Sequence, residues 1–293
     1  MNQSKLKELT SKIYYLPFGE NYRPNLVAIV GAQITLLVDA GNSPKHAKLF
    51  LEELSKCDIA PIKYVALTHW HWDHHFGLAA MNFTSIAHFK TKEKMVELSH
   101  FSWDDESIQK RVEEGTENIF VRDGIKQEFP EANRTIQIGT IDISFTEKLE
   151  IQLGDLFCII ENVGGDHSSD SSIIFVPEEK VVLTGDCLSP NPYRKDGKIE
   201  YRTEKLFPLI DKLKSYNAEY YVNSHGLPMT RTTFEKWCQE FILIGSLVEK
   251  QNKQFEEILS ELKNKAHKEN KAIDDSWLEE KSFIIQAFLN GLD

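Results

Sequence analysis

The feature that most constrains the fold of this chain is the segment HWHWDH at residues 69–74, which lies just after an apolar stretch, IKYVAL, at residues 62–67. The apolar stretch has the length and composition of a buried strand. Alternate residues leaving a strand end point the same way, so the first two histidines can bind one metal ion, and the turn that follows directs the aspartate and the third histidine to a second ion. Imidazole and carboxylate groups are ligands typical of zinc or iron, not of calcium. The segment therefore predicts a metal site at a strand end; the alternative is a histidine-rich surface loop.

The chain on either side of this segment alternates between strand and helix patterns. Residues 26–38 (LVAIVGAQITLLV) predict two strands joined by a turn, and residues 45–56 place leucines among charges as an amphipathic helix does. A short helix is expected at residues 78–82. Residues 90–134 are charged and mostly helical in pattern, which indicates an insertion at one edge of the fold.

The second half of the chain changes from strand patterns to helix patterns. Further strands are predicted at residues 134–138, 141–145, 147–153, 157–161, 172–176 and 180–184. From residue 231 onward the apolar residues recur at helical spacing. These patterns predict a sheet-rich domain over residues 1–230, which contains the insertion, and a C-terminal helical extension over residues 231–293.

Two apolar stripes mark the helical extension. The first contains Phe234, Trp237 and Phe241, and the second extends from Trp277 to Phe288. Such stripes must bury against the rest of the chain or against a second subunit. The second stripe favours a homodimer.

Composition excludes several classes of protein. The chain has 34 Lys and Arg against 45 Asp and Glu, and its net charge of −11 argues against a broad basic surface for nucleic acid or anionic lipid. No window approaches the roughly 20 apolar residues that span a bilayer, and the N-terminal segment lacks an apolar run of signal-peptide length, so we expect no membrane partner and a cytoplasmic location. The four cysteines lie far apart, which predicts reduced thiols.

Three further segments carry residues of the same metal-binding chemistry. They are GGDHSSDSSIIF at residues 164–175, VVLTGD at residues 181–186 and NSHG at residues 223–226. Together with HWHWDH, and in this order, they resemble the metallo-β-lactamase superfamily of metal-dependent hydrolases. The resemblance spans residues 13–230. It implies an α/β fold, a four-layer αβ/βα sandwich of two mixed β-sheets with the site at one edge.

The resemblance also implies a set of seven metal ligands. One ion would be held by His69, His71 and His167, the other by Asp73, His74 and His225, and Asp186 would bridge the two. We expect two divalent ions, zinc first and iron or manganese as alternatives, because all seven side chains suit nitrogen and oxygen coordination. A single ion at the first three histidines is the alternative. A hydroxide shared between the two ions would be the nucleophile, since bound metals lower the pKa of water to about 7.

Departures from the resembling enzymes bear on the substrate. The best-known zinc β-lactamases have a cysteine where this chain has Asp186 and a substrate-binding lysine where it has Ser189. We therefore expect hydrolysis of a small, neutral or weakly charged ester, lactone or amide in preference to penicillins. Asp73 or a metal-bound water would protonate the leaving group, and Tyr193 is a candidate oxyanion donor.

The same motifs are compatible with three further functions on this fold. A phosphodiesterase uses the same metal chemistry, a mononuclear iron dioxygenase of the superfamily keeps a similar first motif, and a non-catalytic regulator is the third. Metal content distinguishes them. Two zinc or manganese ions favour hydrolysis, one iron ion favours oxygen chemistry, and no metal favours a binding protein.

The residues around the ligands are expected to shape the pocket. A wall made of Trp70, Trp72, His75 and Phe76, together with the insertion, would select the substrate. Asp39 ends a strand and has two interpretations. It could orient a ligand histidine, or it could serve only as a turn residue.

Overall fold

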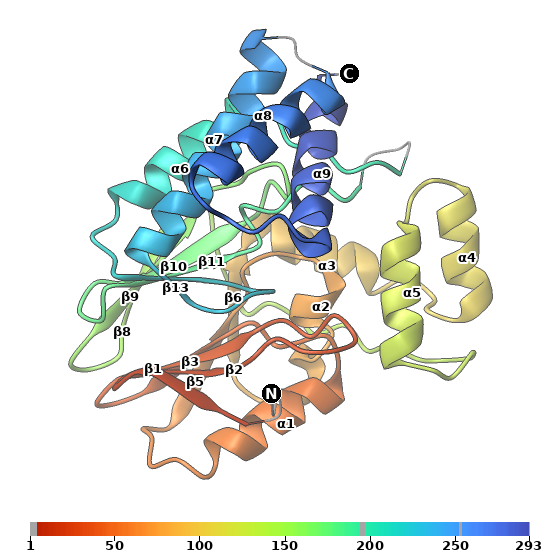
Figure 1. The fold of residues 1–293 in the computed structure, drawn as a ribbon. Helices are drawn as coiled ribbons and strands as arrows, with labels where there is room; N and C mark the ends of the chain where they lie inside the picture. The colour runs from red at the N-terminus through yellow and green to blue at the C-terminus, as the bar shows by residue number, and fades with distance from the viewer. Residues whose placement is uncertain (1–4, 194–196, 252–253, 293) are drawn as a thin grey trace.

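The computed structural model describes residues 5–193, 197–251 and 254–292, and within them two β-sheets face each other. Helices cover the outer faces of both sheets (Figure 1). The first sheet contains, in spatial order, β1 (Lys7–Thr10), β2 (Ile13–Leu16), β3 (Leu26–Val30), β4 (Thr35–Val38), β5 (Ile62–Ala66), β6 (Thr84–His88) and β7 (Ile143–Phe145). The second contains β13 (Met229–Thr230), β12 (Tyr220–Asn223), β11 (Val181–Gly185), β10 (Ser172–Val176), β9 (Phe157–Asn162) and β8 (Lys148–Gln152).

The helices fall into three groups along the chain. The first group is α1 (Pro44–Leu54), α2 (Trp72–His75), the 3-10 helix η1 (Leu78–Ala80) and α3 (Phe89–Leu98). The second is α4 (Asp105–Glu113) and α5 (Ile119–Glu128), and the third is α6 (Thr203–Ser215), α7 (Arg231–Gln251), α8 (Phe255–Lys268) and α9 (Asp275–Asn290). Within the described ranges, no helix combines the length and the hydropathy needed to cross a bilayer.

Strand β3 shows why the chain forms four layers. Its side chains alternate, so Val27 and Ile29 face the second sheet, whereas Leu26 and Ala28 pack with residues of α1 and α3. Because both faces of the strand are covered, all five of its residues are buried and its sequence is continuously apolar. On the far side, α6 and α7 cover the second sheet. The predicted αβ/βα sandwich is confirmed.

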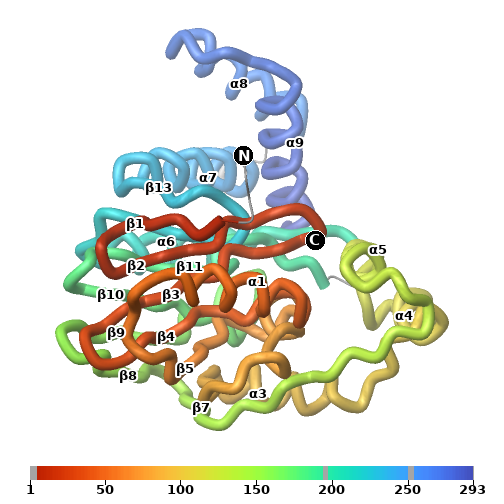
Figure 2. The backbone as a smooth tube through the Cα atoms, turned by 90° about the horizontal axis from the view of Figure 1, so that it is seen from below, coloured from red at the N-terminus to blue at the C-terminus, as the bar shows by residue number. Residues whose placement is uncertain are grey.

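The predicted insertion contains three helices, and two of them form a lobe beside the sandwich. Helices α4 and α5 stand apart from both sheets (Figures 1 and 2). A small apolar core joins Trp103, Ile108 and Ile125 of this lobe to Trp72 and Phe76, which belong to the metal-binding loop. The lobe is therefore packed directly against the segment that carries the first ligands.

One predicted strand is wrong. Residues 134–138 pair with neither sheet. The Arg134 guanidinium instead donates to the backbone carbonyls of Trp103 at 2.9 Å and Phe129 at 2.7 Å, and Ile136 is buried against the lobe. These contacts attach the segment to the insertion, so its backbone does not pair with a sheet edge.

The C-terminal helices pack on the outer face of the second sheet. The Phe234 ring stacks on Tyr221 of β12 with ring centroids 3.8 Å apart, and Ile284 and Phe288 of α9 are buried in the same core. Both apolar stripes are thus largely buried within one chain. The homodimer stays a prediction, because the stripes no longer require a second subunit.

Candidate metal centre

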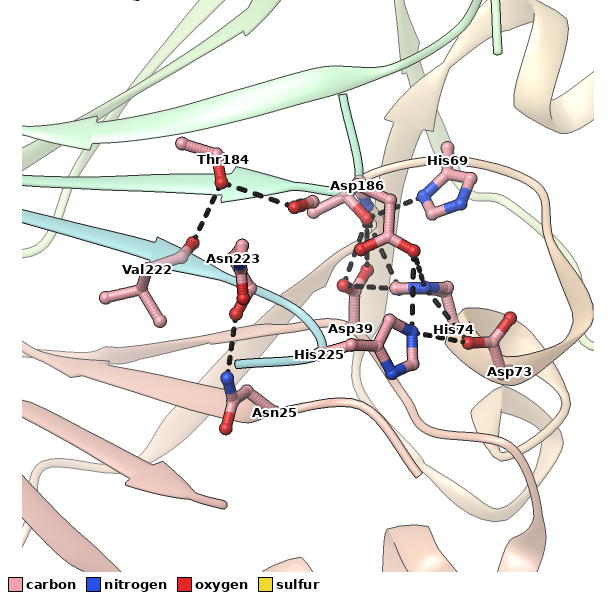
Figure 3. Close-up of polar contacts among 12 residues, drawn as sticks. Asn25, Asp39, His69, Asp73, His74, Thr184, Asp186, Val222, Asn223 and His225 are labelled. Atoms are coloured by element: carbon pink, nitrogen blue, oxygen red, sulfur yellow. Dashed lines mark hydrogen bonds and ion pairs between the residues drawn. The ribbon is translucent and has the colours of Figure 1, made fainter. Parts of the chain in front are cut away.

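The predicted ligands gather at one edge of the sandwich, where several strands end. Figure 3 shows five of them, namely His69, Asp73, His74, Asp186 and His225. Asp186 follows β11 and His225 follows β12, and these neighbouring strands are parallel, so their carboxyl ends meet. His69 follows β5 of the other sheet, and His71, Asp73 and His74 lie at the start of α2. His167 comes from the loop between β9 and β10.

A close approach between the two sheets brings these strand ends together. Gly185 has a φ of +54°, and a Cβ atom at this position would lie 2.9 Å from the Cβ atom of Thr68. Glycine therefore lets the end of β11 contact the residue before His69. The contact places Asp186 beside ligands that the other sheet supplies.

The first group of ligands is made of three imidazoles. The ligand atoms of His69, His71 and His167 lie within 4.8 Å of one another. The Nε2 atoms of His69 and His167 are 3.1 Å apart, and the Nε2 atom of His71 is buried without a hydrogen-bond partner. Three nitrogens that converge in this way suit one N-coordinated metal ion.

The second group contains Asp73, His74, Asp186 and His225, again with ligand atoms within 4.8 Å of one another. The Asp73 Oδ2 atom lies 3.0 Å from His225 Nε2 and 3.3 Å from His74 Nε2. The Asp186 Oδ2 atom lies 3.4 Å from the same two nitrogens and 3.7 Å from His167 Nε2 of the first group. Asp186 therefore stands between the two groups, as a bridging carboxylate must.

The hydrogen bonds behind the imidazoles test whether these residues fit a cation. His167 Nδ1 lies 3.0 Å from the Pro190 carbonyl oxygen, which can only accept, so Nδ1 carries the proton. His69 Nδ1 lies 3.0 Å from the Thr68 hydroxyl, which itself donates to the Asp39 carboxylate. Both rings then direct a lone pair from Nε2 at each other across 3.1 Å. This arrangement fits a cation between the nitrogens, since two lone pairs cannot bond to each other.

The electrostatics differ between the two groups. Burial and the neighbouring imidazoles lower the pKa of His69 and His71 well below the ordinary value, so both rings are neutral. Burial opposes ionisation of Asp73 and Asp186, yet the adjacent histidines hold the pKa of both carboxyl groups well below their usual range. The carboxylates in turn outweigh burial and raise the pKa of His225 to about 10. Without metal, the second group therefore carries protons where an ion would bind.

Asp39 orients a ligand, which supports the first of its two predicted roles. Its Oδ2 atom lies 2.8 Å from His74 Nδ1, and its Oδ1 atom accepts a hydrogen bond from the Thr68 backbone N–H at 2.8 Å. Asp39 adopts the left-handed conformation with a φ of +61°, which is uncommon for a residue other than glycine. The single carboxylate thus fixes His74 directly and His69 through Thr68.

Replacing Asp39 with alanine is expected to weaken metal binding by about 10-fold to 100-fold, because the imidazole of His74 loses the partner that orients it. Competition with a chromophoric chelator measures this affinity. The control is Asp58→Ala, which removes an exposed carboxylate from a loop away from the site. Equal affinity in the Asp39 variant and the control would contradict the orienting role.

A cavity of about 510 Å³ opens onto both ligand groups. The ligands that line it are His71, Asp73, His167, Asp186 and His225. The remaining described lining residues are Tyr22, Trp72, Asn118, Phe120, Val121, Ser189, Pro190, Pro192, Tyr193, Gly197, Ile199 and Phe283. Most of this wall is apolar or aromatic.

The predicted pocket wall is correct only in part. Trp72 and the insertion line the cavity, but His75 and Phe76 are fully buried and do not. His75 ends α2 and Phe76 comes directly after it, and the Phe76 ring packs against that of Trp103 with ring centroids 4.9 Å apart. Trp70 does not line the cavity either, but its ring packs against that of the lining residue Tyr193, with ring centroids 5.2 Å apart. The sequence predicted that the insertion and the C-terminal helices shape access to the metals, and Phe120 and Phe283 belong to these two elements. It did not single out these two residues or Tyr22, because all three are remote from the motifs.

Tyr193 lies in the cavity wall beside the first ligand group. Its ring centroid is 5.2 Å from that of His71, and its backbone N–H donates to the Asn191 side chain at 2.9 Å. The phenol forms a hydrogen bond with Glu117, and burial together with this carboxylate holds the pKa of Tyr193 well above its ordinary value. Tyr193 is therefore a protonated donor.

Comparison with known proteins agrees with this geometry. The family model described as the metallo-beta-lactamase superfamily matches residues 22–225, which include every predicted ligand. The chain belongs to the metallo-β-lactamase superfamily. Its fold and its two groups of ligand residues make it a metal-dependent hydrolase of that superfamily. No curated protein matches the chain in sequence.

Solved structures share the fold over most of the chain, including parts outside the metal-binding motifs. A metallo-beta-lactamase from Pontibacter korlensis superposes with a TM-score of 0.55 at 16% identity, covering 80% of this chain and 97% of that one. The stereoselective inverting sec-alkylsulfatase Pisa1 from Pseudomonas sp. gives a TM-score of 0.64 at 16% identity, covering 98% of this chain. A double mutant of the same sulfatase gives 0.63 at 16% identity, with 88% covered. This chain spans about half the length of the sulfatase chains, 51% and 46%.

Proposed function

We propose that this member of the metallo-β-lactamase superfamily hydrolyses a small, neutral or weakly charged ester, lactone or amide. The observation that carries the proposal is the cavity of about 510 Å³ beside both ligand groups. Its described lining residues include no lysine or arginine, and most are apolar or aromatic. The described lining residues favour an uncharged acyl group over a strongly anionic one, because they offer no lysine or arginine to pair with an anion in exchange for lost hydration.

The seven ligands would divide the metal-binding work as their positions suggest. His69, His71 and His167 would hold one ion, Asp73, His74 and His225 the other, and Asp186 would contact both. Two divalent ions, zinc first with iron or manganese as alternatives, would lower the pKa of a bound water and polarise the bond to be cleaved. The protein itself fixes the imidazole orientations through Asp39, Thr68 and the Pro190 carbonyl.

Two side chains are assigned to proton transfer and charge stabilisation. Asp73 lines the cavity, and we assign to it proton transfer to the leaving group. Since its carboxyl group is ionised, it would first take up the proton that the attacking water releases and then pass that proton on. Tyr193 would donate its hydroxyl proton to the oxygen that gains charge. A phenol has only one proton, so donation to the substrate would require Tyr193 to release Glu117 as its acceptor.

A small molecule is the proposed partner of this site, and nucleic acid is not. The net charge of −11 gives no general attraction to a polyanion. Arg194 and Lys195 follow Tyr193 in the sequence, but they lie outside the described residues. The metal ions themselves would attract a carbonyl oxygen or a weakly charged group.

The substrate class is tested by comparing kcat/KM on a panel with one metal-loaded preparation. Esters, lactones and amides should exceed penicillin and a phosphodiester by at least about tenfold, equivalent to about 1.4 kcal/mol of transition-state binding. A secondary alkyl sulfate belongs in the panel, because sulfatases share the fold. If kcat/KM for penicillin, the phosphodiester or the sulfate were higher by at least about tenfold, the proposed substrate class would be wrong, whereas the assignment of the metal centre would be unaffected.

Metal analysis of the same preparation distinguishes a hydrolase from a dioxygenase and from a non-catalytic regulator. Two zinc or manganese ions per chain support the hydrolytic centre. One iron ion with oxygen consumption would support the dioxygenase, and purified protein that binds no metal would support the regulator. The metal content is measured before any substrate is added.

A further inference from the structure

Two elements that are not part of the sandwich contribute side chains to the cavity wall. Phe120 belongs to α5 of the insertion, and Phe283 belongs to α9 of the C-terminal extension. Both side chains line the cavity, although 56% and 50% of their surfaces are exposed. Together with the other apolar lining residues, these two side chains provide an apolar surface that an apolar ligand could cover.

A row of aromatic rings leads from the ligands to Phe120. Trp72 stands between the ligands His71 and Asp73 in the sequence, and its ring centroid is 6.3 Å from that of Tyr22. The Tyr22 ring is in edge contact with Phe120, with centroids 4.4 Å apart. One wall of the cavity is therefore continuously aromatic from the metal centre outward.

This wall is fixed in place by close packing. A Cβ atom on Gly124 of α5 would lie 2.8 Å from both the Trp72 and the Tyr22 ring, so only glycine lets the helix approach so closely. At the start of α5, the Asn118 side chain donates to the Pro192 carbonyl. At its end, Glu128 pairs with Arg23 at 2.8 Å. The wall is preformed, which reduces the entropic cost of binding a ligand.

A second wall, which contains Phe283 of α9 and Ile199, is anchored independently. Lys281, two residues before Phe283 on α9, is only 4% exposed and pairs with Glu240 of α7 at 2.8 Å. The Asn290 side chain of α9 donates to the backbone carbonyl of Ile199, another lining residue, at 2.8 Å. The first contact holds α9 against α7, and the second holds it against the segment around Ile199.

We propose that the two walls bind an extended apolar chain of the substrate, so that the enzyme selects esters, lactones or amides of medium-chain hydrophobic acids. The inference rests on the proposed function, because it assumes an acyl group at the metal centre. Each methylene buried between the walls should raise kcat/KM by about threefold to fourfold. Phe120 and Phe283 are then the specificity-determining residues.

The first test measures kcat/KM for the 4-nitrophenyl esters of butanoic, hexanoic and octanoic acid. The value should rise by on the order of 100-fold from butanoate to octanoate. Phe120→Ala and Phe283→Ala should each reduce the octanoate-to-butanoate ratio by about tenfold, and Phe283→Leu should fall between the wild type and Phe283→Ala. Ile119→Ala is the matched control, because Ile119 is 57% exposed on the same helix and does not line the cavity.

The second test measures binding without turnover. The dissociation constants of butanoate, hexanoate and octanoate for the metal-loaded protein should fall along the series by about threefold to fourfold per methylene, and the two alanine variants should flatten that trend. One outcome is that no ester is hydrolysed but the dissociation constants fall with chain length in a way that depends on both phenylalanines. The proposed function would then be wrong, and the inferred apolar binding site would be supported. If esters are hydrolysed without a chain-length trend in rate or binding, this inference is overturned and the proposed function stands.

Discussion

Replacing Asp186 with alanine is expected to lower the metal content from two ions per chain to one or fewer, and kcat/KM by about 10³-fold or more. One oxygen of this carboxylate lies 3.4 Å from the Nε2 atoms of His74 and His225 and 3.7 Å from that of His167. It therefore contacts both ligand groups, and its loss removes a charge that each ion needs. A metal ion supplies several kcal/mol of transition-state stabilisation, and about 4 kcal/mol corresponds to 10³-fold.

The control for this variant is Asp142→Asn. The Asp142 carboxylate accepts hydrogen bonds from the Ser85 backbone N–H at 2.8 Å and from the Ser85 hydroxyl at 3.0 Å, beside the sandwich edge formed by β6 and β7. Its loss should affect stability without changing the metal content. Elemental analysis and circular dichroism of both variants separate metal loss from unfolding. A folded Asp186→Ala protein that retains two ions and wild-type activity would contradict the assignment of the whole centre.

Removing the metals with a chelator is expected to lower Tm by at least about 10 °C. A ligand present at about 1,000 times its dissociation constant stabilises the folded state by about 4 kcal/mol for each site. For a chain of this size, about 1 kcal/mol corresponds to a shift of roughly 2–4 °C. Differential scanning calorimetry with and without chelator measures the change. Identical Tm values would show that the folded protein binds the ions no better than the unfolded chain does.

The stabilisation by metal should also increase with pH. In the metal-free protein the pKa of His225 is raised to about 10, against about 6.5 in an unfolded chain. Such a group stabilises the folded state fully below pH of about 6.5, and this contribution is lost as the pH rises toward about 10. The Tm of the metal-free protein should therefore fall between pH 7 and pH 9. Metal ions replace the proton on His225, so the loaded protein should lack this trend.

The metal ligands were predictable because their chemistry is local or strongly restricted by residue type. His69, His71, Asp73 and His74 lie within six residues at a strand end, where backbone geometry alone directs them. The resemblance supplied the three distant ligands, and the structure brings all seven together. Strands such as β3 and β10 were predicted because nearly all of their residues are apolar, and nearly all are buried because both faces are covered.

The sequence patterns were weakest where burial is partial. Strand β1 (KELT) has no buried residue, so neither its composition nor its alternation distinguishes it from a loop. Residues 134–138 are the opposite case. Ile136 and Ile138 are two positions apart, as apolar residues on one face of a strand are, but they pack with the insertion. In both cases the hydrogen-bond partner of the backbone decides the structure, and that partner is remote in the sequence.

By itself, then, the sequence determined most strands and helices and the four ligands of the HWHWDH segment, because periodic burial and ligand spacing are properties of neighbouring residues. The resemblance to the superfamily added the layers of the fold and the three distant ligands. Only the tertiary structure decided what surrounds the centre. The Pro190 carbonyl that orients His167 is a backbone group, which every residue type offers equally. The walls of the cavity join Tyr22, Phe120 and Phe283, which lie up to 261 residues apart in the chain. Their meeting depends on how the insertion and α9 pack against the sandwich, and no local pattern encodes that packing.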